Sequence, residues 1–224
     1  MPPRWRWLPL LLCVAWLVPS DIAEEPAPLM TVLDDARVLV AGRIVVQRAE
    51  RTVILPAVVN QHRGLVEYLL VHATGKRHES LFSTMVSPLH MHLACLLAGA
   101  PETGAAPMPV QVDVRWQTNG PTISEAAERF LLPATHEAQP VPGASAMPAA
   151  WAYGGSRFSA DGFAAKMEGS CIALQADPAA LVQAPGLSGE FIPDASRLPP
   201  IGSPVSIVLT FPSPAATQTT KESP

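Results

Sequence analysis

Aliphatic and β-branched residues are concentrated in short segments that polar or proline-rich stretches separate, a pattern typical of strands joined by surface turns. The segments that predict strands are residues 37–47, 52–55, 66–72, 80–86, 110–116, 171–174 and 205–211. Only the polar residues 48–51 separate the first two segments, which therefore predict a hairpin. Apolar and polar side chains alternate in residues 110–116, so this strand should have one buried face.

Three helices are predicted, because three segments open with a start signal. The signals are Ser87-Pro88 as N-cap and first helical residue, the capping box from Thr122 to Glu125, and Asp177-Pro178. The helices should cover residues 88–98, 126–131 and 179–183. With the strands they predict an α+β fold in one domain, a mainly antiparallel β-sheet with about three short helices.

The N-terminal residues have the arrangement of a secretory signal. Arg4 and Arg6 precede an apolar run from Leu8 to Val18, shorter than the ~20 residues of a membrane-spanning helix. We expect cleavage after Ser20, a periplasmic or secreted product, and no membrane span after cleavage. The expected organisation is a signal peptide over 1–20, a linker over 21–30, the domain over 31–211 and a disordered tail over 212–224.

Loss of the signal changes the charge of the chain. Removing Arg4 and Arg6 lowers the 15 basic residues to 13 against 19 acidic ones, a formal charge of −6. A basic stripe is absent from the sequence. The electrostatic attraction that dominates nucleic-acid binding is therefore missing, and we expect neither nucleic acid nor an anionic membrane as a partner.

The cysteines limit the cofactors that the chain can hold. Cys13 lies in the signal, which leaves Cys95 and Cys171 after export. The pair either closes a disulfide or forms two buried thiols, since both lie in apolar surroundings. Without a Cys-x-x-Cys spacing they predict neither an iron–sulfur cluster nor a zinc ribbon, and we expect no cofactor.

Four histidines, His72, His78, His90 and His92, fall within twenty-one residues. A metal site with His78, Glu79 and His90 as ligands is one interpretation. Structural roles for the histidines are the other interpretation. Side chains two positions apart on a helix point about 200° away from each other, so His90 and His92 should diverge.

Two further segments offer candidate ligand contacts. The turn from Lys76 to Ser80 combines donors, an acid and a hydroxyl after a glycine, as functional loops do, although surface turns are also polar for solubility alone. Trp151 and Tyr153 lie on one side of an extended segment, where they predict either a binding shelf or the edge of the core.

Several of these motifs occur together in one family. The motifs are Glu67-Tyr68-Leu69, Gly75-Lys76-Arg77-His78-Glu79-Ser80-Leu81, Pro88-Leu89-His90, Trp151-x-Tyr153-x-Gly155-Ser156 and Asp177-Pro178-Ala179-Ala180-Leu181. Their order resembles the YdjY-type domain of bacterial exported proteins over about residues 30–211. The resemblance implies relatives without an established activity, and places Glu67, Lys76, His78, Glu79 and His90 in a shared pattern.

The sequence favours a non-catalytic exported domain that binds an envelope protein or a small ligand. The ligand-binding candidates are Glu67, Lys76, His78, Glu79, Ser80, His90, Trp151 and Tyr153. The alternative is a metal-dependent enzyme that uses His78, Glu79 and His90 as ligands or acid–base groups. No nucleophile-bearing motif assigns a reaction.

Overall fold

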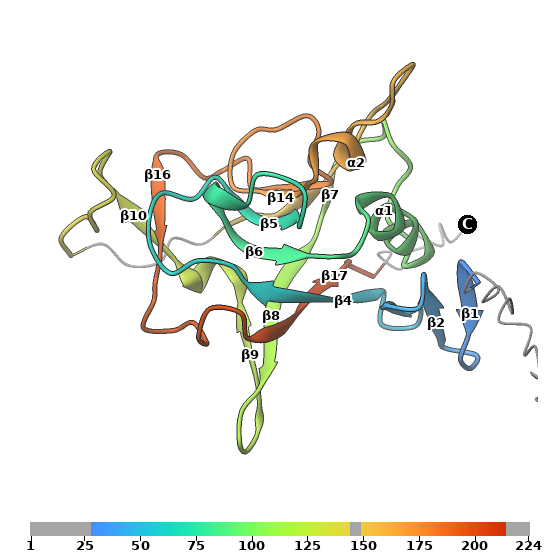
Figure 1. Ribbon diagram of the computed structural model, residues 1–224. Helices are drawn as coiled ribbons and strands as arrows, with labels where there is room; N and C mark the ends of the chain where they lie inside the picture. Colours follow the sequence, from blue (N-terminus) through green and yellow to red (C-terminus); the bar gives the residue numbers. More distant parts are fainter. Residues whose placement is uncertain (1–27, 144–148, 214–224) are drawn as a thin grey trace, which may run out of the picture.

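The computed structural model describes residues 28–143 and 149–213 (Figure 1). The expected signal peptide, most of the expected linker and residues 214–224 of the expected tail lie outside the described residues. The first strand begins at Met30, the last residue of the expected linker.

Thirteen strands belong to one sheet. They are β1 (Met30–Val32), β2 (Arg37–Val40), β3 (Ile44–Gln47), β4 (Thr52–Val59), β5 (Tyr68–His72), β6 (Ser80–Thr84), β7 (Met108–Pro109), β8 (Gln111–Gln117), β9 (Thr122–Ala126), β11 (Ala152–Tyr153), β14 (Ser170–Ala173), β15 (Val182–Gln183) and β17 (Pro204–Thr210). The remaining elements are the pairs β10 (Leu131–Ala134) with β16 (Glu190–Pro193) and β12 (Phe158–Ser159) with β13 (Gly162–Phe163), the helices α1 (Pro88–Leu97) and α2 (Ala164–Glu168), and the 3₁₀ helices η1 (Arg77–Glu79) and η2 (Ala127–Phe130). The fold is therefore sheet-dominated α+β, mostly antiparallel, with two α-helices in the described residues.

The main sheet curls back on itself. From β7 the ladder runs through β11, β15, β14, β5, β6 and β4 to β17, which pairs with β8. Only Val110 separates β7 from β8, and its N–H donates to the carbonyl of Trp151 at 3.0 Å. Figure 1 shows β4 and β6 on the near side of the molecule, so the outer face of these two strands is turned toward the viewer.

The predicted turn of the N-terminal hairpin, at residues 48–51, is confirmed. β3 and β4 pair antiparallel around residues 48–51, with Gln47 opposite Thr52. The first segment, residues 37–47, is itself a hairpin of β2 and β3, because Ala41 and Gly42 both adopt positive φ and reverse the chain.

Two pairs of strands are parallel although only short connections join them. β5 and β6 pair with Tyr68 beside Ser80, and β14 and β15 pair with Ile172 beside Val182. In each case the connection runs back along the strands, so that the second strand starts beside the first. The two returning segments, residues 73–79 and 174–181, lie at the turn and at the Asp177 motif that the sequence singled out.

The interior of the curled sheet is the hydrophobic core. Its largest fully buried side chains include Tyr153, Phe82, Phe130 and Phe191. In β8 the buried residues are Val112 and Val114 while Gln111 is exposed, which confirms the alternating pattern predicted for this strand.

One of the three predicted helices is confirmed. α1 begins at Pro88 after the N-cap Ser87 and ends at Leu97. The helix predicted over 126–131 is present only as the short 3₁₀ helix η2 (Ala127–Phe130), and the prediction of a helix over 179–183 was wrong. Residues 122–126 form β9, since Thr122 pairs with Gln117 across the turn at Asn119-Gly120 and does not cap a helix.

The segment after Asp177-Pro178 also joins the sheet. Asp177 accepts a hydrogen bond from the N–H of Ala179 at 2.8 Å, as a helix cap does. The chain then enters β15, which pairs with β14 and β11 on its two sides. Sheet pairing at a distance outweighs the local helix signal here.

Within residues 28–143 and 149–213, no helix combines the length and the apolar character required to cross a membrane.

Candidate functional site

Lys76 anchors the returning segment after β5, residues 73–79, to the sheet. Its Nζ donates to the Tyr68 hydroxyl at 2.7 Å and lies 4.9 Å from the centre of that ring. The Tyr68 hydroxyl donates in turn to Asp177 Oδ2 at 3.0 Å, so both returning segments are tied to the same phenol. The hydrogen bond to Tyr68 raises the pKa of Lys76, and burial raises the pKa of Tyr68. Lys76 therefore stays protonated and holds the fold together at this point.

Ser80 and Glu67 also have structural roles. The Ser80 side chain is fully buried and donates to the carbonyl of Phe82 at 2.7 Å, so its prediction as a ligand contact was wrong. The backbone of Glu67 donates to Glu79 and accepts from Leu174, which joins β5 to its neighbours, and the Glu67 residue is exposed.

The structure does not bring together the alternative metal set. His78 Nε2 lies 3.7 Å from Glu79 Oε2, and the His78 side chain is 80% exposed. His90 lies in a different place, at the start of α1. In the described part of the chain, no three His, Cys, Asp or Glu side chains are close enough to hold a metal ion.

Tyr153 is a core residue. Its hydroxyl lies 2.6 Å from His92 Nδ1, and the two rings are stacked. Burial raises the pKa of Tyr153 and lowers that of His92, so both groups stay neutral. The core-edge interpretation therefore holds for Tyr153.

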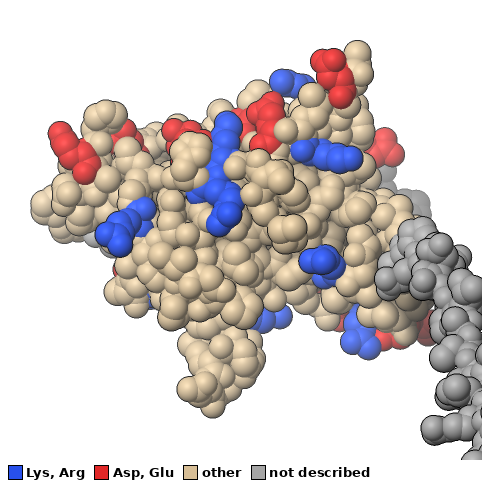
Figure 2. All heavy atoms as spheres, viewed as in Figure 1, with Lys and Arg blue, Asp and Glu red and all other residues tan. Residues whose placement is uncertain are grey.

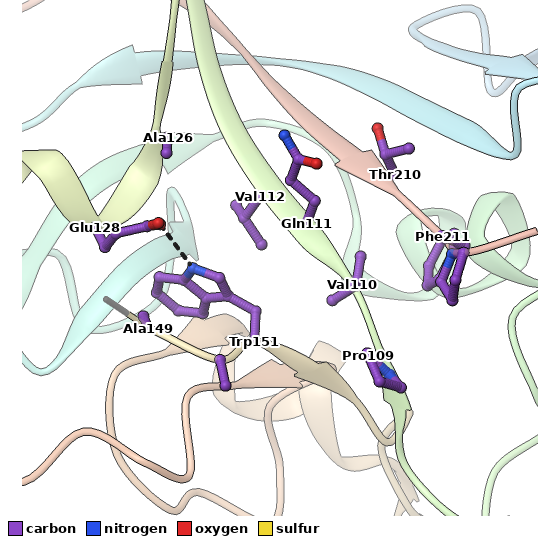
Figure 3. A pocket seen from close by; sticks show the side chains of 12 residues that line it. Pro109, Val110, Gln111, Val112, Ala126, Glu128, Ala149, Trp151, Thr210 and Phe211 are labelled. Carbon is purple, nitrogen blue, oxygen red and sulfur yellow. Dashed lines mark hydrogen bonds between the residues drawn. The ribbon is translucent and has the colours of Figure 1, made fainter. Parts of the chain in front are cut away.

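Trp151 is only 4% exposed, and its Nε1 donates to Glu128 at 3.2 Å. Its ring nevertheless lines a pocket, which Figure 3 shows.

The two cysteines are free and fully buried, which agrees with the interpretation as buried thiols. Burial raises the pKa of Cys95, and raises that of Cys171 to about 12. Both thiols are therefore protonated at neutral pH and unreactive as nucleophiles.

Another candidate for a functional site is a surface groove over β4 and β6, here called the β4–β6 groove. It consists of two adjoining hollows, of about 390 and 260 Å³. The first is lined by Arg43, Pro56, Ala57, Val58, Ala73, Arg77, Ser83, Thr84, Met85 and Pro204. The second is lined by Ala41, Arg43, Ile44, Met85, Val86, Ser87 and His90. The hollows share Arg43 and Met85 as lining residues and are therefore neighbours on the surface.

The floor of the groove is apolar because strand β4 carries apolar residues on its outer face. Val58 lies opposite Pro204 of β17 on one side and Ser83 of β6 on the other. Val58 is 38% exposed, and Met85, which follows β6, is 67% exposed. Exposed apolar side chains grouped on a sheet face are typical of a contact surface.

The rim of the groove is electropositive. Arg43 and Arg77 line it, and Asn60 Oδ1 accepts a hydrogen bond from Arg77 Nε at 3.0 Å, which orients that guanidinium. The N-terminus of α1 lies at the second hollow, where Ser87 makes no side-chain cap and the first turn has no acid. Of the described residues that line the groove, none is acidic. In Figure 2, acidic side chains lie toward the edges of the face over β4 and β6.

The groove contains part of the site that the sequence predicted. His90 lines it, and Arg77 comes from the predicted turn of residues 76–80. Lys76, Glu79, Trp151 and Tyr153 do not line it. Sequence reasoning missed Arg43, which follows the glycine of the β2–β3 turn; a basic residue next to a tight turn was the available signal.

In comparisons with known proteins, the chain matches no family model, no curated protein and no solved structure. The resemblance to the YdjY-type domain remains a prediction from the motifs alone.

Proposed function

We propose that the chain is an exported, non-catalytic binding protein of the cell envelope, and that the β4–β6 groove receives an acidic and partly apolar segment of a partner protein. The observation that carries the proposal is the composition of the groove. An exposed apolar floor lies beside two arginines and a helix N-terminus, and no described lining residue is acidic. Such a surface attracts a carboxylate and buries the apolar side chains next to it.

The shape of the groove favours an extended polypeptide over a small molecule. Small ligands are usually held in concave pockets that enclose most of their surface. Here Met85 and Val58 project into solvent, and the two hollows follow one another along the surface from Pro204 to His90. An extended segment can place an apolar side chain over Val58 and Met85, and a carboxylate beside Arg43.

Two features of the sequence support export. Arg4 and Arg6 followed by the apolar run from Leu8 to Val18 have the order of a signal peptide. The resemblance to the YdjY-type domain of exported proteins points to the same compartment.

The proposal predicts that binding depends on acidic side chains in the partner. The probe is a synthetic peptide that alternates leucine and glutamate, compared with the same peptide containing glutamine in place of glutamate. Titration calorimetry with the full chain should give at least about tenfold tighter binding for the glutamate peptide, because each charged hydrogen bond contributes about 1.5–3 kcal/mol. The affinity should fall as salt is added.

Arginine variants test whether the groove is the binding surface. Arg43→Gln and Arg77→Gln should each weaken the glutamate peptide about three- to tenfold while leaving the glutamine peptide unchanged. Arg63→Gln is the matched control, since Arg63 is exposed and does not line the groove. Equal affinity for the two peptides, or an equal loss with Arg63→Gln, would contradict the proposal.

A further inference from the structure

A second cavity lies on another part of the sheet, here called the Trp151 pocket. It has a volume of about 480 Å³, within the range of small-molecule sites. Its lining residues are Pro109, Val110, Gln111, Val112, Ala126, Glu128, Ala149, Ala150, Trp151, Thr210, Phe211 and Pro212. Figure 3 shows the indole of Trp151 along one side with its nitrogen toward Glu128, and Thr210 and Phe211 on the opposite side.

The consecutive strands β7 and β8 build the pocket together with the segment at Trp151 and the helix η2. The carbonyl of Trp151 accepts from Val110, which fixes the tryptophan beside the strand. Glu128 lies in η2, directly after β9, and its Oε2 accepts from Trp151 Nε1 at 3.2 Å. In the described chain Glu128 forms no ion pair, so its negative charge is not neutralised by a neighbouring side chain.

The pocket is electronegative. Of its described lining residues, none is lysine, arginine or histidine. Arg129, the residue after Glu128, pairs instead with Glu125 at 3.5 Å. Asp113, which does not line the pocket, accepts from Gln111 at 2.8 Å; burial and the charge of Glu128 raise the pKa of Asp113 on balance, although Gln111 and the charge of Arg115 lower it. Among the described lining residues Glu128 is thus the one charged side chain, in contrast to the β4–β6 groove with its two arginines.

We propose that the Trp151 pocket binds an organic cation, an alkylammonium group with apolar substituents. The carboxylate of Glu128 supplies the opposite charge, and the indole face of Trp151 attracts the cation through its ring quadrupole. Val110, Phe211 and Pro109 provide apolar walls for the alkyl groups. This site is independent of the proposed peptide groove.

The walls favour an organic cation over a metal ion. Divalent metals such as calcium need six or more oxygen ligands, whereas most of the described lining here is hydrocarbon. The described residues also contain no group of three acidic, histidine or cysteine side chains that could hold a metal. A bulky ammonium needs only one carboxylate and aromatic or aliphatic surroundings.

The test uses choline as the probe and 3,3-dimethylbutan-1-ol as its uncharged isostere. The readout is the indole N–H resonance of Trp151 in ¹⁵N-labelled full chain, identified by its absence in Trp151→Phe. Choline should shift this resonance in a saturable way, with an affinity at least about tenfold higher than that of the alcohol. Equal affinities of the two compounds, or no shift at all, would overturn the proposal.

Glu128→Gln separates charge from packing, because the amide oxygen still accepts from the Trp151 indole. The variant should lose about tenfold in choline affinity and keep its affinity for the alcohol. Glu102→Gln is the matched control, since Glu102 is an exposed acid outside the pocket. An unchanged choline affinity in Glu128→Gln would overturn the assignment. The glutamate-peptide affinity of the same variant reports separately on the β4–β6 groove, where no change is expected.

Discussion

The side chain of His92 is buried among aromatic rings at the inner face of α1. Its Nδ1 lies 2.6 Å from the Tyr153 hydroxyl, and the rings of Phe163 and Phe158 lie 5.1 and 6.3 Å from its own ring. Burial lowers the pKa of His92. A proton on this imidazole would be poorly solvated, and the protein is therefore most stable when His92 is neutral.

This burial predicts that acid destabilises the protein. An unfolded histidine takes up a proton near pH 6.5, whereas His92 in the fold does so only at lower pH. The stabilisation is thus fully present above about pH 6.5 and is lost as the pH falls toward the folded pKa. Urea unfolding between about pH 7.5 and 5 should show a decline that is smaller in His92→Gln.

His136 provides the opposite case as a control. Its hydrogen bond to Glu190 raises the pKa of His136, so its contribution to stability is present below the unfolded pKa and is lost as the pH rises through the folded value. His136→Gln should therefore not reduce the decline in acid. A pH dependence that is the same in His92→Gln and in the parent chain would contradict the role of His92.

Residue types alone could not show which polar side chains face the proposed groove. The sequence marked Lys76 for its position in a polar turn, but its charge is directed at Tyr68 and Asp177 inside the fold. Arg77, its neighbour, points to the groove instead. Which of two adjacent basic residues faces a site depends on the path of the returning segment, which the local sequence does not specify.

At the scale of elements, the end of α2 is packed against the returning segment that follows β5. Gly169, which ends α2 with φ of +73°, lies against Gly75 of the turn after β5. A Cβ at Gly169 would come within 2.7 Å of Gly75 Cα. Tyr68 bridges the segments nearby through Lys76 and Asp177. Backbone contact without side chains thus sets the geometry of this region.

Gly169→Ala should therefore be strongly destabilising. The left-handed conformation costs a non-glycine residue roughly 1–2 kcal/mol, and the backbone clash adds to it, so we expect a loss of at least about 2 kcal/mol in the free energy of unfolding. Gly186→Ala is the matched control, because no atom lies within 4 Å of its Cβ position. It should change the free energy by less than about 0.5 kcal/mol. Similar losses in both variants, measured by chemical denaturation, would contradict this explanation.

Elements with strong local patterns were predictable, and those that depend on distant partners were not. Helix α1 was predictable from its N-cap and its first proline, and strand β8 from its alternation of apolar and polar residues. The segments of β9 and β15 carry helix signals, yet they form strands because they pair with β8 and β14. Helix α2 has no capping side chain at its start, which explains why no start signal marked it.

At the scale of the whole molecule, both proposed binding surfaces combine segments that are far apart in the sequence. The β4–β6 groove combines the β2–β3 turn, β4, the segment after β5 and the start of α1. The Trp151 pocket combines β7 and β8 with η2, Trp151 and the end of β17. Each set of residues spans more than a hundred positions of the chain, so no sequence window contained either site. The two surfaces have opposite charge, which suits a protein that binds two different ligands.

The central claim is that the β4–β6 groove is the surface that contacts a partner. Methionine methyl groups report on it directly, because Met85 lies in the groove and is 67% exposed, whereas Met167 is 59% exposed on α2, outside the groove. In the full chain labelled with ¹³C-methyl methionine, saturation with the leucine–glutamate peptide should shift the Met85 resonance and leave that of Met167 in place. A shift of Met167 without one of Met85, or an unchanged Met85 at saturating peptide, would contradict the account.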